Sequence, residues 1–142
     1  MATYNLDNVA GAVVLEVNNP QLANRFERHY NPKAQAGLAV GDVVYFDLVV
    51  PVWVRTIVVQ KRTDTANADT LTVQCQDAGP TIAPVLPIKT ANGVQTGGST
   101  SNTANGSVLM QLYPVGNKIR VSLTLATSVP NQCDLSVSLY DA

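Results

Sequence analysis

Residues that could perform chemistry are few and widely spaced in this chain. His29 is the only histidine, and Cys75 and Cys133 are the only cysteines. A nucleophile activated by histidine needs that histidine within reach of a Ser or Cys, and a zinc site needs several His, Cys or acidic ligands brought together. One histidine and two distant cysteines do not supply these patterns. We therefore expect no enzymatic activity, no metal site and no cofactor.

The two cysteines allow one disulfide at most. Two cysteines in 142 residues do not make a disulfide scaffold, and Cys75 falls on the apolar side of an alternating run. We favour free thiols, and the sequence leaves a disulfide between Cys75 and Cys133 open.

Four acidic residues are placed as carboxylates in turns are usually placed. Asp64 and Asp69 flank one polar turn, and Asp134 and Asp141 flank the last apolar run. No Asp-x-Asp-x-Asp-Gly run of the kind that binds calcium accompanies them. We expect these carboxylates to stabilise turns and to bind no metal ion.

Asp47 is different, because it interrupts the apolar run Val43–Val50. A buried acid needs a charged or hydrogen-bonding partner, and Arg55 or Arg120 could supply it. Two carboxylates could also make a glycosidase pair. We favour a structural or subunit-interface ion pair over a general acid.

Composition excludes other functions. The chain has 9 Lys and Arg against 10 Asp and Glu, a formal charge of −1, so no long-range field would attract nucleic acid or an acidic membrane. No apolar run approaches the roughly 18 residues of a membrane helix, and the first residues lack the pattern of a secretory signal. We expect a soluble product of the cytoplasm, or a mature form that has already been cut, that contacts neither nucleic acid nor membrane.

Alternating and apolar runs separated by turn residues predict about eight strands and no βαβ pattern. Val43–Val50 has apolar residues on both faces, which predicts burial on both sides. Pro51 should bend the chain before a second long strand. The other expected strands lie at 12–17, 53–61, 70–76, 108–113, 119–125 and 135–140.

Two segments depart from this pattern. Leu22, Phe26 and Tyr30 are spaced four residues apart, which predicts one short helix over Gln21–Tyr30. Thr90–Ser107 reads as one long loop, with Asn-Gly turns near both ends and a short ribbon possible between them.

We therefore predict an all-β fold in one domain over 1–142: a jelly-roll-like antiparallel β-sandwich. It would have an N-terminal strand and arm at 1–38, a main sandwich at 39–142, and one long Thr/Gly/Asn-rich loop. Charged residues are only 13% of the chain, against about 25% in ordinary soluble domains. Part of the surface should therefore be covered by partners.

The arm holds the candidate contact residues. Cations alternate there with aromatic rings, and interfaces are enriched in arginine and aromatic residues. A helix that simply covers one sheet edge is the alternative interpretation. The candidate partner-contact residues are Arg25, Phe26, Arg28, His29, Tyr30 and Lys33.

Residues 38–140 resemble small bacteriophage virion proteins with a jelly-roll sandwich. The resemblance rests on Gly41-Asp42-Val43-Val44, which leads through Leu48 to Pro51, on the strand pair after it, and on the closing Ser138-Leu139-Tyr140. It implies a capsid decoration or cement protein, a homo-oligomer and most often a trimer, seated on the major capsid protein at the capsid surface after assembly in the host cytoplasm. Trp53 and the Thr90–Ser107 loop do not map onto this pattern.

Two other functions compete with this one. Trp53 or an exposed tyrosine could stack on a sugar, which would make the chain a carbohydrate-binding sandwich. A jelly roll could also be the major coat or fibre-head subunit of a virus. The strongly basic arm common in coat proteins that package nucleic acid is absent from Arg25–Lys33.

Overall fold

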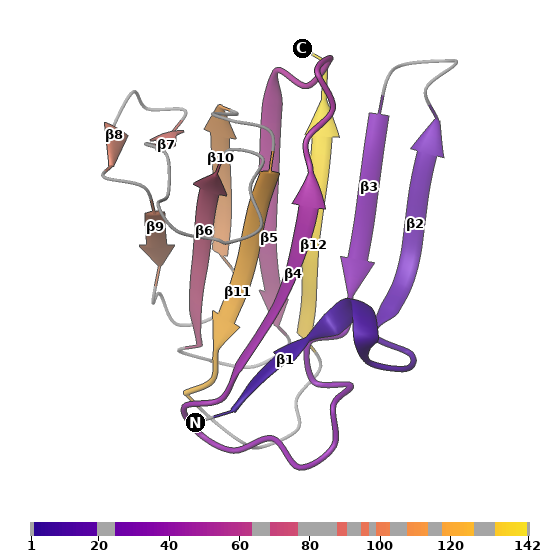
Figure 1. Ribbon diagram of the computed structural model, residues 1–142, viewed down its shortest axis with the longest axis vertical. Coiled ribbons are helices and arrows are strands. Elements are labelled where there is room, and N and C mark those ends of the chain that lie inside the picture. Colours follow the sequence, from indigo (N-terminus) through magenta and orange to yellow (C-terminus); the bar gives the residue numbers. More distant parts are fainter. Residues whose placement is uncertain are drawn as a thin grey trace.

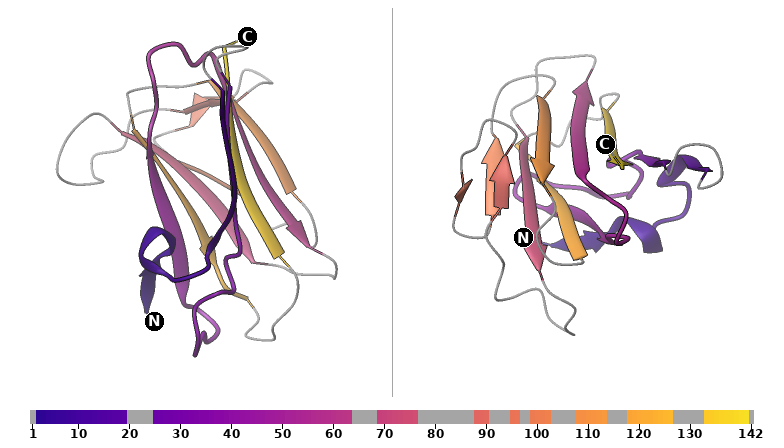
Figure 2. Two further views of the ribbon diagram at one scale, coloured as in Figure 1. Left: turned by 90° about the vertical axis from the view of Figure 1, so that its right-hand side faces the viewer. Right: turned by 90° about the horizontal axis from the view of Figure 1, so that it is seen from above.

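Two β-sheets make up almost all of the described chain in the computed structural model (Figure 1). The structure describes residues 2–19, 25–63, 69–76, 88–90, 95–96, 99–102, 108–113, 118–126 and 133–141. Figure 2 shows the sheets as two facing layers. The predicted all-β sandwich is confirmed.

The first sheet, sheet A, has five strands. In spatial order they are β1 (Thr3–Asn5), β4 (Val43–Val49), β11 (Lys118–Thr124), β6 (Thr70–Gln76) and β9 (Ser99–Asn102). Only β1 pairs in parallel, with β4. A 3₁₀ turn, η1 (Leu6–Asn8), follows β1.

The second sheet, sheet B, has seven strands, and all its pairs are antiparallel. Their order is β2 (Val13–Asn19), β3 (Arg25–Tyr30), β12 (Cys133–Tyr140), β5 (Thr56–Thr63), β10 (Val108–Tyr113), β7 (Ile88–Thr90) and β8 (Gln95–Thr96). β2 forms one margin of the molecule, on the right in Figure 1.

The connectivity of the sandwich is that of a jelly roll. β3 pairs with β12, β4 with β11, β5 with β10 and β6 with β9, each antiparallel. The chain is therefore one long hairpin wrapped so that successive pairs alternate between the sheets. This arrangement gives two Greek keys, as the jelly-roll prediction requires.

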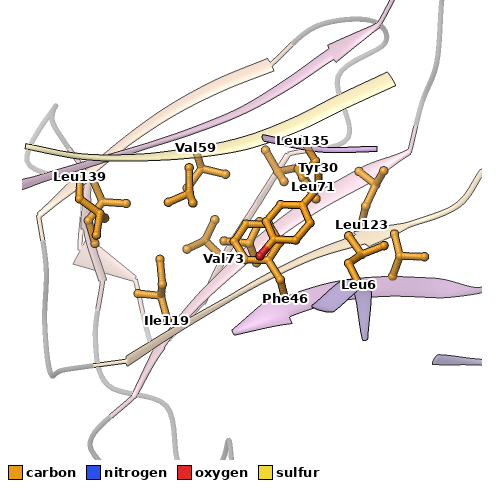
Figure 3. Close-up of a cluster of buried hydrophobic side chains, with 14 of the residues drawn as sticks. Leu6, Tyr30, Phe46, Val59, Leu71, Val73, Ile119, Leu123, Leu135 and Leu139 are labelled. Carbon is orange, nitrogen blue, oxygen red and sulfur yellow. The ribbon is translucent and has the colours of Figure 1, made fainter. Parts of the chain in front are cut away.

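The core lies between the sheets and follows the two-residue period of the strands. Alternate residues of β4, β5, β6, β11 and β12 point inward, and the ring of Tyr30 lies over that of Phe46 (Figure 3). Fully buried core side chains include Leu6, Val59, Leu71, Val73, Leu123 and Leu135. The clean alternation in the sequence thus places the core correctly.

The predicted helix over Gln21–Tyr30 is wrong, because Arg25–Tyr30 is strand β3. Leu22 lies outside the described residues. A spacing of four puts Phe26 and Tyr30 on one face of a strand as well as of a helix. Pairing with β2 on one side and β12 on the other satisfies the backbone of β3, so tertiary pairing decides between the two.

Two-sided burial of Val43–Val50 is also wrong. Val44 and Phe46 are fully buried, whereas Val49 on the other face is 67% exposed. The bend after Pro51 is confirmed: the amide of Val54 donates to the carbonyl of Pro51 at 3.1 Å. The next strand therefore begins at Thr56.

The Thr90–Ser107 segment is more than a loop. It includes β8, which pairs with β7 in sheet B, and β9, which pairs with β6 in sheet A. Residues 91–94, 97–98 and 103–107 lie outside the described part of the chain. Cys75 and Cys133 belong to β6 and β12, on different sheets.

Candidate contact surface

The six candidate contact residues divide among two faces of β3 and the turn after it. Tyr30 points into the core, so Arg28 and Phe26 share its side of the strand. Arg25 and His29 point to the outer face of sheet B. The predicted reaching arm is therefore incorrect, because this segment lies inside a seven-stranded sheet.

Lys33 is not a surface cation. Its ammonium lies 3.0 Å from Oδ2 of Asp69, and the two side chains are 8% and 0% exposed. Asp69 also accepts the backbone amide of Ala126 at 2.6 Å, and its carbonyl accepts Lys61 Nζ at 2.9 Å. The prediction of a partner contact at Lys33 is corrected to a buried ion pair, and Asp69 is part of the interior instead of a surface turn.

Tyr30 belongs to the core, which corrects its prediction as a contact residue. Its ring is fully buried and stacks on Phe46 with centroids 4.2 Å apart and an interplanar angle of 15°. The hydroxyl donates to Asp7 Oδ1 at 2.7 Å. Burial, together with this hydrogen bond, raises the pKa of the Tyr30 phenol.

Arg28 is held in place by its own chain. Its guanidinium pairs with Glu16 on β2, donates to the Tyr30 hydroxyl at 3.1 Å and lies 5.1 Å from the centre of the Phe26 ring. Burial opposes the charged form, but the hydrogen bonds to Tyr30 and Glu16 prevail and raise the pKa of Arg28. This network joins β2 to β3.

His29 lies between two carboxylates on the outer face of sheet B. Nε2 is 2.6 Å from Glu27 Oε1, and Nδ1 is 3.0 Å from Asp134 Oδ2 on β12. Burial disfavours the imidazolium, but hydrogen bonds to Asp134 and Glu27 outweigh it and raise the pKa of His29. Both ring nitrogens contact carboxylates, so His29 acts as a clamp that links β3 to β12.

The exposed apolar residues of β2 were missed by sequence reasoning. Val13, Val14 and Leu15 are 45%, 58% and 52% exposed. The sequence predicted a strand here but carried no signal for its place at a sheet edge. β2 pairs with β3 alone among the residues described, so these side chains and one row of β2 backbone groups face outward.

Asp47 has the partner that its position demands. Arg120 binds it through two hydrogen bonds of 2.7 and 2.9 Å on the outer face of sheet A. The guanidinium lies 3.9 Å from the centre of the Tyr45 ring. Of the two predicted partners, Arg120 is the one the fold supplies, from the neighbouring strand β11.

Three of the aromatic residues that could have stacked on a sugar contact other side chains of the chain. Trp53 is partly buried and packs against the core. Arg120 covers one face of Tyr45, and the Arg25 guanidinium lies 6.0 Å from the Tyr140 ring centre. The described residues hold no cluster of three or more potential metal ligands, and none of their helices is long and apolar enough to cross a membrane.

Comparisons with known proteins give likenesses of fold. No family model and no curated protein matches the chain. The SPBc2 prophage-derived protein YomS is similar at 12% identity, over 85% of this chain and 98% of that one, with a TM-score of 0.45. The module CBM6cm-2 from Cellvibrio mixtus lichenase 5A is similar at 9% identity, over 96% and 94%, with a TM-score of 0.36. A CBM4 structure is similar at 10% identity, over 94% and 77%, with a TM-score of 0.30.

Proposed function

We propose that the chain is a non-enzymatic structural protein of a bacteriophage virion. It decorates the outside of the capsid by binding the major capsid protein, and it does so as a symmetric homo-oligomer. The observation that carries this proposal is the open edge of β2, where Val13, Val14 and Leu15 are about half exposed. The resemblance of residues 38–140 to small phage virion proteins supports the same role.

An exposed apolar edge favours a contact function on physical grounds. Free strand edges template pairing with other chains, and natural proteins usually guard them. Exposed apolar side chains gathered in one place mark interaction sites. A subunit of a permanent assembly can keep such an edge, because its partners cover the edge.

The polar groups of β3 also suit a structural role better than a chemical one. Both nitrogens of His29 contact carboxylates, and Arg28 is committed to Glu16 and Tyr30. A general base or nucleophile site would need one of these groups to face a substrate. Here they tie β3 to β2 and β12.

Binding to phage particles tests the proposal. Particles of the phage that encodes the chain, grown without it, are mixed with the purified protein and sedimented through a density gradient. We expect saturable co-sedimentation and, by electron microscopy, added density on the outer capsid surface. A matched control uses particles that already carry the protein, which should bind no more.

Three outcomes would contradict this role. Protein that stays at the top of the gradient at every concentration would exclude capsid decoration. Protein that assembles into closed shells alone would make it a coat subunit. Density confined to a tail or fibre would assign it to that part of the virion.

A further inference from the structure

In the part of the chain that the structure describes, the two sheets have four edges, and these edges differ in length. β1 and β9 close sheet A with three and four residues, and β8 closes one side of sheet B with two. β1 covers β4 only from Val43 to Tyr45, which leaves four residues of β4 beyond it. β2 closes the other side of sheet B with seven residues. Short edges are one natural protection against pairing, and β2 lacks it.

β2 also lacks most of the residues that prevent an edge strand from pairing with another chain. Val13–Asn19 contains no Lys, Arg or Pro. Its single charge, Glu16, is neutralised by Arg28 on the neighbouring strand. A bulge between Val13 and Leu15 is the one guard that it has, and the register with β3 is regular from Leu15 to Asn19. The edge is therefore apolar, nearly uncharged and long enough to pair.

The nature of the partner follows from the other edges. A head-to-tail contact between copies joins two different surfaces, so β2 would need a second open edge of similar length. The other edges of the described sheets run to two to four residues. A two-fold contact needs only β2 itself, because it places the same surface on both sides.

We propose that β2 pairs antiparallel with β2 of a second copy across a two-fold axis, which joins the two B sheets into one continuous sheet. The inference rests on the proposed homo-oligomer and names its interface. It replaces the three-fold symmetry that the resemblance implies with a two-fold at this contact.

Charge and apolar contact select the register. Centred on Leu15, the pairing sets Leu15 on the outer face of sheet B against Leu15 of the second copy. Centred on Glu16, it would oppose two carboxylates, which is destabilising. We therefore assign Leu15 to the two-fold axis, with the bulge at Val14 of each copy on either side of it.

The first experiment measures mass in solution by light scattering on the full chain. The wild type should have twice the mass of one chain, and Leu15→Lys should shift it to a single chain at the same concentration. Val52→Lys is the matched control, because Val52 is fully exposed in a turn, and it should remain a dimer. Circular dichroism confirms that each variant is folded.

A crosslinking variant keeps the test independent of the charge change. Directly opposed antiparallel residues have Cα atoms about 4.5–5.5 Å apart, within the roughly 4.4–6.8 Å of a disulfide. Leu15→Cys should therefore form a covalent dimer on mild oxidation. The wild type and Val52→Cys, treated in the same way, should stay single chains on a denaturing gel.

The inference is overturned by a wild type that is a monomer or trimer, by a dimer that survives Leu15→Lys, or by Leu15→Cys that does not crosslink. These outcomes are separate from capsid binding. A monomer that still co-sediments with capsids removes the two-fold contact and keeps the structural role. A dimer that never binds capsids keeps the two-fold contact and removes the proposed role on the capsid.

Discussion

Arg120 on β11 donates two hydrogen bonds to Asp47 on β4, from Nε to Oδ1 at 2.7 Å and from Nη2 to Oδ2 at 2.9 Å. The two residues are directly opposite in the register of these strands. The guanidinium also lies 3.9 Å from the centre of the Tyr45 ring. The hydrogen bonds to Asp47 prevail over burial and raise the pKa of Arg120. The edge of the guanidinium therefore binds Asp47, and its face lies against the Tyr45 ring.

Replacing Arg120 should therefore cost more than a typical surface pair. Exposed pairs contribute about 0–1 kcal/mol, and a stacked cation adds about 0.5–1 kcal/mol, so Arg120→Ala should lower the free energy of unfolding by about 0.5–2 kcal/mol. Arg120→Lys is the informative control, since it keeps the charge but loses the fork. Urea denaturation measures both. Equal stability of Arg120→Lys and wild type would show that charge alone matters.

Sequence reasoning succeeded here because an acid in an apolar strand must find a partner. It succeeded for the core strands for a similar reason, since Leu71, Val73, Val121 and Leu123 alternate with polar residues. It failed at β3, where helix and strand both place Phe26 on the same face as Tyr30. No local pattern distinguishes them, and pairing with β2 and β12 is information from distant residues.

Asp69 is a polar residue whose environment the local sequence also failed to predict. Its place beside a polar turn predicted a surface carboxylate, but it is fully buried and bound to Lys33. Breaking a buried pair by removing one partner typically costs about 3–5 kcal/mol, because the remaining charge stays buried. Asp69→Ala should therefore lose about 3 kcal/mol or more of unfolding free energy in a urea titration.

Asp141 provides the matched control for Asp69, because it is exposed. Asp141→Ala should change stability by less than about 0.5 kcal/mol, as ordinary surface substitutions do. If the two variants lose the same amount, the Lys33–Asp69 pair adds nothing to stability.

His29 should make stability depend on pH near neutrality. Its pKa is raised from the ordinary value of 6.5 because hydrogen bonds to Asp134 and Glu27 outweigh burial. A raised pKa means that the folded state holds the proton more tightly than the unfolded state. The contribution is complete below the unfolded pKa of about 6.5 and is lost as the pH rises through the folded pKa. Urea midpoints should fall over that interval.

His29→Gln should flatten this dependence, because the remaining amide does not titrate. The same variant should restore part of the ordinary pKa of Glu27, which the His29 hydrogen bond lowers against a smaller effect of burial. Nuclear magnetic resonance titration of His29 in the wild type measures the shift directly. A pKa below 6.5 would contradict the clamp.

Gly41 opens β4 in a conformation that side chains disfavour. Its φ is +90°, and an added Cβ would meet nothing within 4 Å. Its amide donates to the Leu125 carbonyl at 2.8 Å. The next residue, Asp42, accepts the amides of Ala2 and Ala39, each at 2.9 Å. The turn therefore ties the N-terminus and the end of β11 to the start of β4.

Gly41→Ala should destabilise the protein through the backbone alone. Left-handed conformations cost non-glycine residues about 1–2 kcal/mol, and the open space around Gly41 leaves no steric contribution to add. Gly41→Asn should lose less, because asparagine visits this region more readily. Urea denaturation gives both values. A larger loss for Asn than for Ala would mean that side-chain volume, instead of the positive φ, limits this turn.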